Sequence, residues 1–152
     1  HGKELWNHHK MVKRTMFNYD GVEGGKTGYT TKAGGTLVTF AKRGDQELIV
    51  VDLCAHGYEL YEDTIKMLNY GFNNYKTIAP FKTMNTVLKD DTYGFLKTGN
   101  ELSPYKIPLK HLNDVTVMLE KNQSASKLTY KCKDNKYIIS YDGKQIGSVK
   151  LH

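Results

Sequence analysis

The sequence predicts an α+β fold, in which a sheet with a helix is followed by a small all-β sandwich domain. Two β-rich apolar runs lie close together, at residues 36–42 and 47–53. A helical pattern follows them, and from residue 79 onward short β-rich stretches replace it. At 152 residues with 39% hydrophobic content, the chain has room for one average domain or two small ones.

The first half is predicted to hold a β-hairpin and a helix. The two runs TLVTFAK and ELIVVDL are joined by RGDQ, which is typical of a hairpin turn. That turn also explains Arg43-Gly44-Asp45 with fewer assumptions than a cell-adhesion tripeptide does. The second run is so apolar that we expect both of its faces to be covered, as in an interior strand. Semi-apolar residues then recur at helical spacing, with Gly71 as the expected helix end. These residues are Leu60, Tyr61, Thr64, Ile65 and Leu68.

The second half has the rhythm of short strands separated by turns. Asp142-Gly143 is a strong signal for a two-residue hairpin loop. Seven such stretches favour a small β-sandwich. They are residues 83–88, 92–97, 105–109, 115–119, 127–131, 136–141 and 146–151.

Charge divides the chain at the same place. The net charge is +6, with 10 Lys and Arg against 9 Asp and Glu up to Ile78, and 12 against 7 from Ala79 onward. We therefore expect two domains, residues 1–78 and 79–152. A basic surface attracts anionic partners without choosing among nucleic acid, lipid and wall polymer. Alternating tyrosine and lysine could stack bases, but half-buried strands produce the same pattern, so we expect no nucleic-acid partner.

The stretch EGGKTGYTTKAGG (23–35) places Lys26-Thr27 among glycines, which suggests either a phosphate loop or a carboxylate site. A P-loop needs G-x-x-x-x-G-K-[ST] between a strand and a helix. Here Asp20 stands where the first glycine should be, and a strand pattern follows Thr27. The carboxylate alternative is therefore favoured.

Lys-Thr-Gly is one of three motifs of active-site serine enzymes. Residues 19–53, followed by YEDTIKMLNYGF (61–72), resemble the C-terminal part of the catalytic domain of D-alanyl-D-alanine carboxypeptidases, the low-molecular-mass penicillin-binding proteins. Residues 79–152 resemble the β-rich domain that follows it in that family. The resemblance implies a partial penicillin-binding/β-lactamase-like antiparallel sheet with a helix in residues 1–78.

The resemblance also implies roles for four residues. Lys26 would supply a compact positive charge to the terminal carboxylate of a D-Ala-D-Ala peptide and join the proton network of the nucleophile. Thr27 would add a hydroxyl donor, and Gly28 would let the peptide approach the strand. The backbone N–H of Tyr29 would form half of the oxyanion hole.

The nucleophile expected for this chemistry is missing from its usual place. The family's S-x-x-K and S-x-N motifs should precede Lys-Thr-Gly, yet no serine precedes Lys26. The downstream matches Ser103 to Lys106 and Ser124 to Lys127 are expected to be loop residues. Since the chain also begins with His1, we expect it to be part of a longer protein and inactive alone.

Three functional classes remain at this point. The first is a serine-type D-Ala-D-Ala carboxypeptidase that trims peptidoglycan stem peptides through an acyl-enzyme and that β-lactams trap. The others are a noncatalytic module that binds wall polymer or a partner, and a noncatalytic relative with a vestigial pocket. The family would place the parent outside the cytoplasmic membrane, attached to that membrane only through segments absent from this chain.

No cofactor or metal is expected. His8 and His9 lack the further ligands that a metal site needs, so we expect both to be solvent-exposed. Cys54 and Cys132 are too few and too far apart for a disulfide scaffold, and we expect two buried, unpaired thiols.

Overall fold

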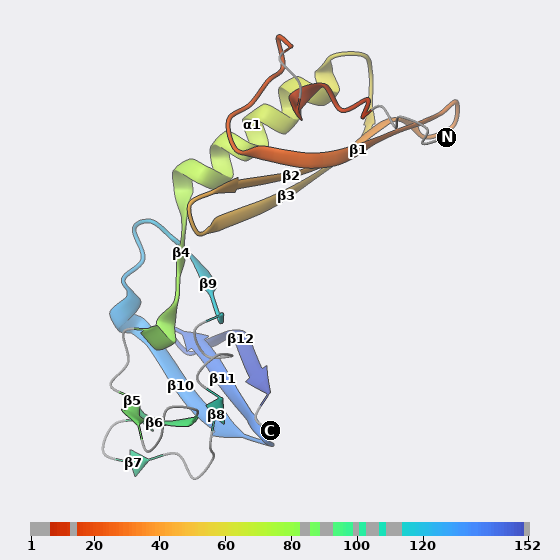
Figure 1. Ribbon diagram of the computed structural model, residues 1–152. Coiled ribbons are helices and arrows are strands. Elements are labelled where there is room, and N and C mark those ends of the chain that lie inside the picture. Colours follow the sequence, from red (N-terminus) through yellow and green to blue (C-terminus); the bar gives the residue numbers. More distant parts are fainter. Residues whose placement is uncertain are drawn as a thin grey trace, which may run out of the picture. The chain divides into compact units, whose positions relative to one another are not determined.

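The structure is a computed structural model that describes residues 7–12, 15–82, 86–88, 93–98, 101–102, 107–108 and 114–150. The fold is mixed α+β, with one α-helix in the described residues and antiparallel sheets (Figure 1). The chain divides into two compact units between Tyr75 and Lys76. The sequence places the domain boundary slightly later, after Ile78, and that boundary stays a prediction.

The first unit is a three-stranded sheet with a helix across one face (Figure 1). The strand order is β1-β2-β3, and both pairings are antiparallel. Its elements are the 3-10 helix Lys10–Val12, β1 (Val22–Thr30), β2 (Gly34–Arg43), β3 (Gln46–Ala55) and α1 (Glu59–Asn74).

The hairpin between β2 and β3 forms where the sequence predicts it. Arg43 pairs with Gln46, so Gly44 and Asp45 make a two-residue loop, and Gly44 takes the positive φ of 58° that such loops need. The Arg43 guanidinium donates to the Asp20 carbonyl oxygen through Nε and Nη2, at 3.2 and 3.1 Å. Arg43-Gly44-Asp45 is therefore part of the hairpin, as expected.

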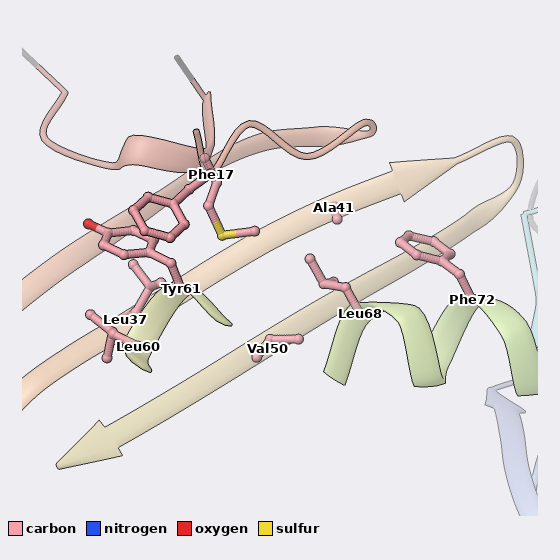
Figure 2. Close-up of a cluster of buried hydrophobic side chains, with 9 residues drawn as sticks. Phe17, Leu37, Ala41, Val50, Leu60, Tyr61, Leu68 and Phe72 are labelled. Atoms are coloured by element: carbon pink, nitrogen blue, oxygen red, sulfur yellow. The ribbon is translucent and has the colours of Figure 1, made fainter. Parts of the chain in front are cut away.

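The core of the first unit lies between the sheet and α1 (Figure 2). Leu37 of β2 and Leu68 of α1 are fully buried, and each such side chain contributes roughly 1.5–3 kcal/mol to stability. The buried cluster consists of Met11, Phe17, Leu37, Ala41, Val50, Leu60, Tyr61, Leu68 and Phe72. The predicted helical stripe is thus confirmed as the buried face of α1.

Two predictions about this unit are wrong. β3 lies at an edge of the described sheet, and Ile49, Val51 and Leu53 are 70%, 53% and 67% exposed, so only one face of the strand is covered. Gly71 does not end the helix, which continues to Asn74. A Cβ on Gly71 would fall 2.6 Å from Leu48 Cδ1, so this glycine allows close packing of α1 on β3.

The second unit is built mainly from strands. β4 (Tyr75–Ile78) pairs with β9 (Val117–Glu120), and β10 (Leu128–Lys133), β11 (Lys136–Tyr141) and β12 (Lys144–Lys150) form a three-stranded sheet. The short strands are β5 (Thr86–Leu88), β6 (Tyr93–Thr98), β7 (Glu101–Leu102) and β8 (Ile107–Pro108), which pair in a further sheet. The core holds Phe81, Val117, Leu119, Leu128, Tyr137 and Ile139.

The predicted strands of this half are confirmed where the structure describes them. Each of the seven stretches overlaps a strand, whereas β4 and β7 were not predicted. Asp142 and Gly143 have φ values of 49° and 80°, as a two-residue hairpin loop between β11 and β12 requires. The sandwich arrangement itself stays a prediction. In the described part of the chain, no helix combines the length and the apolar content needed to cross a membrane.

Candidate functional site

The Lys-Thr-Gly sequence lies on β1, at one edge of the three-stranded sheet. In the antiparallel pairing with β2, Lys26 opposes Val38 and Gly28 opposes Thr36. Within the residues that the structure describes, no strand pairs with the outer edge of β1. An extended ligand therefore has a free strand edge beside residues 26–29.

Lys26 shares a sheet face with exposed apolar residues. Side chains of directly opposed residues lie on the same face, so Lys26, Val38 and Val51 lie together on one side. Val38 is 41% exposed, whereas Leu37 and Thr39, on the side that α1 covers, are fully buried. We call the uncovered side the open face. Its exposed members are Lys26, Val38, Ile49, Val51 and Leu53.

The four predicted site residues form one continuous stretch of this edge. Lys26, Gly28 and Tyr29 are exposed, and Thr27 is half-buried. Thr27 opposes the buried Leu37, so its side chain leaves the strand on the helix side and that of Lys26 on the open face. In this structure Lys26 Nζ donates to the Thr27 carbonyl oxygen at 2.5 Å. Lys26 and Thr27 thus lie on either side of the same free edge.

Two known proteins are similar in sequence to this chain, one over nearly all of it and one over half. The chain is 29% identical over 154 residues to D-alanyl-D-alanine carboxypeptidase DacF of Bacillus subtilis (strain 168), covering 98% of this chain and 37% of DacF. It is 35% identical over 77 residues to D-alanyl-D-alanine carboxypeptidase DacC of Escherichia coli (strain K12), covering 50% of this chain and 18% of DacC. The chain is homologous to part of these D-alanyl-D-alanine carboxypeptidases. The predicted resemblance is confirmed, although the chain spans less than two-fifths of either relative.

Solved structures agree with this homology. Penicillin-binding protein 5 from Haemophilus influenzae matches with a TM-score of 0.57 and 25% identity, over 88% of this chain and 41% of that protein. Penicillin-binding protein 6B from Escherichia coli matches with a TM-score of 0.52 and 20% identity, over 97% and 39%, which supports the fold alone. No protein-family model matches the sequence.

In this carboxypeptidase homologue, Ser124 and Lys127 do not form a nucleophile and base pair. Ser124 caps the 3-10 helix Ala125–Lys127, and its Oγ lies 2.8 Å from Ser126 Oγ. Lys127 Nζ lies 3.5 Å from Asp142 Oδ2 instead. The other formal match, Ser103 and Lys106, lies outside the described residues.

Behind the Lys-Thr-Gly strand lies a histidine that sequence reasoning missed. We expected His8 and His9 to be exposed, but His9 is fully buried, and its Nε2 lies 2.9 Å from Thr39 Oγ1. Thr39 opposes Gly25, the residue before Lys26. Burial lowers the pKa of His9 below its ordinary value of 6.5. The sequence could not predict the burial of His9, because the segment NHHKMV (7–12) is too short to show a periodic pattern of polar and apolar residues.

The remaining titratable groups do not form a metal site among the described residues. No group of three or more His, Cys, Asp or Glu side chains there could hold a metal ion. Cys54 is free and exposed, with a positive φ of 63°, so the prediction of a buried thiol is wrong for this residue. The side chain of Cys132 lies outside the described part.

A hollow of about 480 Å³ lies near the start of α1, away from residues 26–29. Its lining residues are His8, Lys10, Thr15, Met16, Phe17 and Tyr58. Lys10 Nζ lies 4.5 Å from the centre of the Tyr58 ring, a cation–π contact within the chain. None of the residues that line the hollow belongs to the edge strand.

Proposed function

We propose that this chain supplies the carboxylate-binding edge strand of a serine-type D-Ala-D-Ala carboxypeptidase. The whole enzyme would remove the terminal D-Ala from peptidoglycan stem peptides through an acyl-enzyme, and penicillin and other β-lactams would trap it. The observation that carries this proposal is the position of Lys26 on a free strand edge, in a chain homologous to such enzymes. Peptidoglycan lies outside the cytoplasmic membrane, so the enzyme would act there.

The edge supports the recognition of a peptide that ends in a carboxylate. The peptide pairs with β1 as an added strand, and backbone hydrogen bonds hold it. Lys26 then faces its carboxylate from the open face and Thr27 from the helix side. A hydrogen bond to a charged group contributes about 1.5–3 kcal/mol, so Lys26 carries much of the affinity.

Gly28 and Tyr29 support the acyl-transfer step on the bound peptide. Gly28 presents no side chain, and a Cβ there would fall 2.5 Å from Thr36 Oγ1, on the face where Thr36 lies. Because Gly28 has no side chain, a ligand can also approach the backbone closely. The Tyr29 backbone N–H donates to the oxygen of the tetrahedral intermediate, which lowers the acyl-transfer barrier by about 3 kcal/mol.

The open face supports the idea that another stretch of polypeptide completes the site. Ile49, Val51 and Leu53 of β3 expose apolar side chains on the same face as Lys26, with Val38 of β2 between them and Lys26, and such surfaces are typical of interaction sites. A segment that covers this face from β3 across β2 reaches Lys26, where the serine nucleophile and its lysine are needed. This chain contributes the wall that binds the carboxylate, and that segment contributes the reacting hydroxyl.

The affinity of the chain for diacetyl-L-Lys-D-Ala-D-Ala tests the role of Lys26. We expect Lys26→Gln to weaken binding by about tenfold or more, because the charged donor is lost. Lys32→Gln is the matched control, since Lys32 is an exposed lysine in the turn after β1. Equal affinities for the two variants would contradict the assignment of Lys26.

Fluorescent penicillin tests whether the reacting serine lies in this chain. We expect no covalent labelling of the purified chain, because the unit that holds Lys26, residues 1–75, contains no serine. Labelling that survives denaturation, and that maps to Ser103 or Ser124, would show that the nucleophile is here and would overturn this part of the proposal.

A second candidate function rests on the lysines of the second unit. Lys133 opposes Lys136, and Lys136 opposes Lys150, so three exposed lysines lie in a row across β10, β11 and β12. Like charges in directly opposed positions destabilise a sheet, and an anionic ligand relieves that repulsion. The row therefore favours a module that holds the protein against an anionic wall polymer.

Binding of the full chain to isolated wall fragments at rising salt concentration tests this candidate. We expect binding that weakens with salt and that weakens further in Lys136→Gln, the middle lysine of the row. Lys66→Gln on α1 serves as the control, since Lys66 already pairs with Asp63 at 2.8 Å. Binding that Lys136→Gln leaves unchanged would exclude the lysine row as the contact surface.

A further inference from the structure

A buried imidazole lies directly behind the edge strand, and both of its nitrogens have partners. The Met11 backbone N–H donates to His9 Nδ1 at 3.3 Å, and Nε2 lies 2.9 Å from Thr39 Oγ1. The His9 backbone N–H in turn donates to Asn7 Oδ1 at 2.9 Å. The ring is thus held at two points, by its own turn and by β2, while the Asn7 side chain holds the His9 backbone.

These contacts determine which ring nitrogen carries the proton. A nitrogen that accepts a hydrogen bond must offer a lone pair, so Nδ1 is unprotonated when Met11 donates to it. The proton of the neutral ring is then on Nε2, where Thr39 Oγ1 and the Val38 backbone carbonyl oxygen are the acceptors. Protonation of Nδ1 would place two donors against each other in a buried position, at a cost that water cannot relieve.

The ring also touches the strand one residue before Lys26. Gly25 opposes Thr39 in the sheet, and a Cβ on Gly25 would fall 2.5 Å from both Cδ2 and Nε2 of His9. Because Gly25 lacks a side chain, the ring can lie directly against the backbone of β1. The peptide bond between Gly25 and Lys26 holds the Cα of Lys26 at a fixed distance from that of Gly25.

The imidazole also contacts α1. The His9 and Tyr61 rings meet edge to face, with centroids 6.3 Å apart and planes at 80°. Tyr61 is itself stacked on Phe17, with centroids 4.9 Å apart. His9 therefore links the covered face of the edge strand to the packed aromatic cluster of the helix.

We propose that His9 is a positioning residue for Lys26, whose neutral Nε2–H form holds the Gly25–Lys26 segment of β1 in the geometry that binds a carboxylate. It acts through Thr39 and Gly25 and touches no ligand itself. This inference rests on the proposed role of Lys26. Its structural part, that His9 holds the strand, can be tested separately.

Amide hydrogen exchange measures that structural part without a ligand. We expect His9→Leu to lower the protection of residues 25–27 by about tenfold, the effect of one lost hydrogen bond, while the amides of α1 keep theirs. His9→Gln, which can keep a donor near the Nε2 position, should restore most of the protection. An equal loss of amide protection in β1 and α1 would show that His9 is only a core residue. Unchanged protection in β1 would show that His9 does not hold that strand.

Ring nitrogen-15 shifts of the unmodified chain give a second readout that does not depend on a variant folding. We expect the pattern of a neutral ring with its proton on Nε2 at pH 7.5. A ring protonated on Nδ1 would contradict the hydrogen bonding on which the proposal stands.

The affinity for diacetyl-L-Lys-D-Ala-D-Ala tests whether His9 affects ligand binding through β1. We expect His9→Leu to bind about tenfold more weakly than the unmodified chain and His9→Gln to lie near it. Unchanged affinity in His9→Leu would overturn the link to Lys26. If the unmodified chain itself does not bind, the proposed function fails, and the exchange and ring measurements still decide whether His9 holds the strand.

Discussion

Gly25 and His9 approach each other more closely than any side chain at position 25 would allow. A Cβ on Gly25 would fall 2.5 Å from His9 Nε2 and would also meet the Val38 carbonyl oxygen of β2. The glycine before Lys26 therefore has a packing role on the covered side of β1. Ligand contact alone does not explain it.

We expect Gly25→Ala to lower the free energy of unfolding by about 1–3 kcal/mol, because the methyl group overpacks against the ring and a backbone oxygen. Gly24→Ala is the matched control, since no heavy atom lies within 4 Å of a Cβ built there. It should change stability by less than about 0.5 kcal/mol. Urea unfolding measures both, and equal values would contradict this packing.

Stability should fall as the pH falls below about 6.5, the ordinary pKa of histidine. Burial lowers the pKa of His9, so the unfolded chain binds the proton more readily than the folded chain does. The stabilisation is complete above pH 6.5 and is lost as the pH drops from there toward the lowered pKa. Backbone hydrogen bonds with Val38 and with His9 itself favour the imidazolium, but burial is the larger effect.

The difference between variants isolates this contribution from the other titrating groups. Between pH 7.5 and 5, His9→Gln should lose less stability than the unmodified chain, whereas His8→Gln at the exposed neighbour should follow it. A His9→Gln profile parallel to that of the unmodified chain would mean that His9 is not the group responsible.

Asp52→Asn should stabilise the chain at neutral pH. Asp52 Oδ2 is buried and has no hydrogen-bond partner, and burial, with a smaller contribution from Asp63, raises the pKa of Asp52. When the pKa is raised in the folded state, Asp52 does not destabilise the fold below pH 3.8, the ordinary pKa, because the carboxyl group is then protonated in both states. As the pH rises through the pKa of the folded state, the charged carboxylate destabilises the fold. We expect a gain of about 0.5–1 kcal/mol at pH 7.

Thermal unfolding at pH 7 and pH 3 measures this effect, with Glu23→Gln on the exposed side of β1 as the control. The gain in Asp52→Asn should shrink at pH 3, where the carboxyl group is protonated in both states. A loss of stability at pH 7 would show that the charged carboxylate is favourable where it stands.

The two faces of the sheet should respond differently to truncation. Leu37→Ala removes a fully buried side chain and should lower the free energy of unfolding by about 2–5 kcal/mol. Ile49 is 70% exposed, so Ile49→Ala should lower it by less than about 0.5 kcal/mol. Denaturant unfolding compares the two. A large cost for Ile49→Ala would mean that the open face is covered in solution.

Periodicity predicted most of the secondary structure in both halves, although it missed β4 and β7. The stripe from Leu60 to Leu68 and the two runs around residues 36–53 became α1, β2 and β3, because their apolar spacing matches a helix and a sheet. What periodicity could not predict is which face another layer covers. The run of β3 is apolar throughout, yet only alternate residues pack on α1 in this chain.

The surroundings of single residues were harder to predict, because their neighbours come from distant parts of the chain. Gly71 looks like a helix end in sequence, but it accommodates Leu48 of β3. His9 looks like a polar surface residue, but Thr39, thirty positions later, supplies its partner. The Lys-Thr-Gly motif led us to expect an edge strand, and β1, which carries the motif, lies at an edge of the described sheet.

Backbone amide shifts during titration with diacetyl-L-Lys-D-Ala-D-Ala, compared with the same peptide ending in a carboxamide, test the central claim most directly. The two peptides differ only in the negative charge that Lys26 should recognise. We expect the acid to shift residues 26–29 at concentrations where the carboxamide does not. Equal responses to both peptides, or shifts confined to other parts of the chain, would contradict the claim that this strand edge binds a peptide carboxylate.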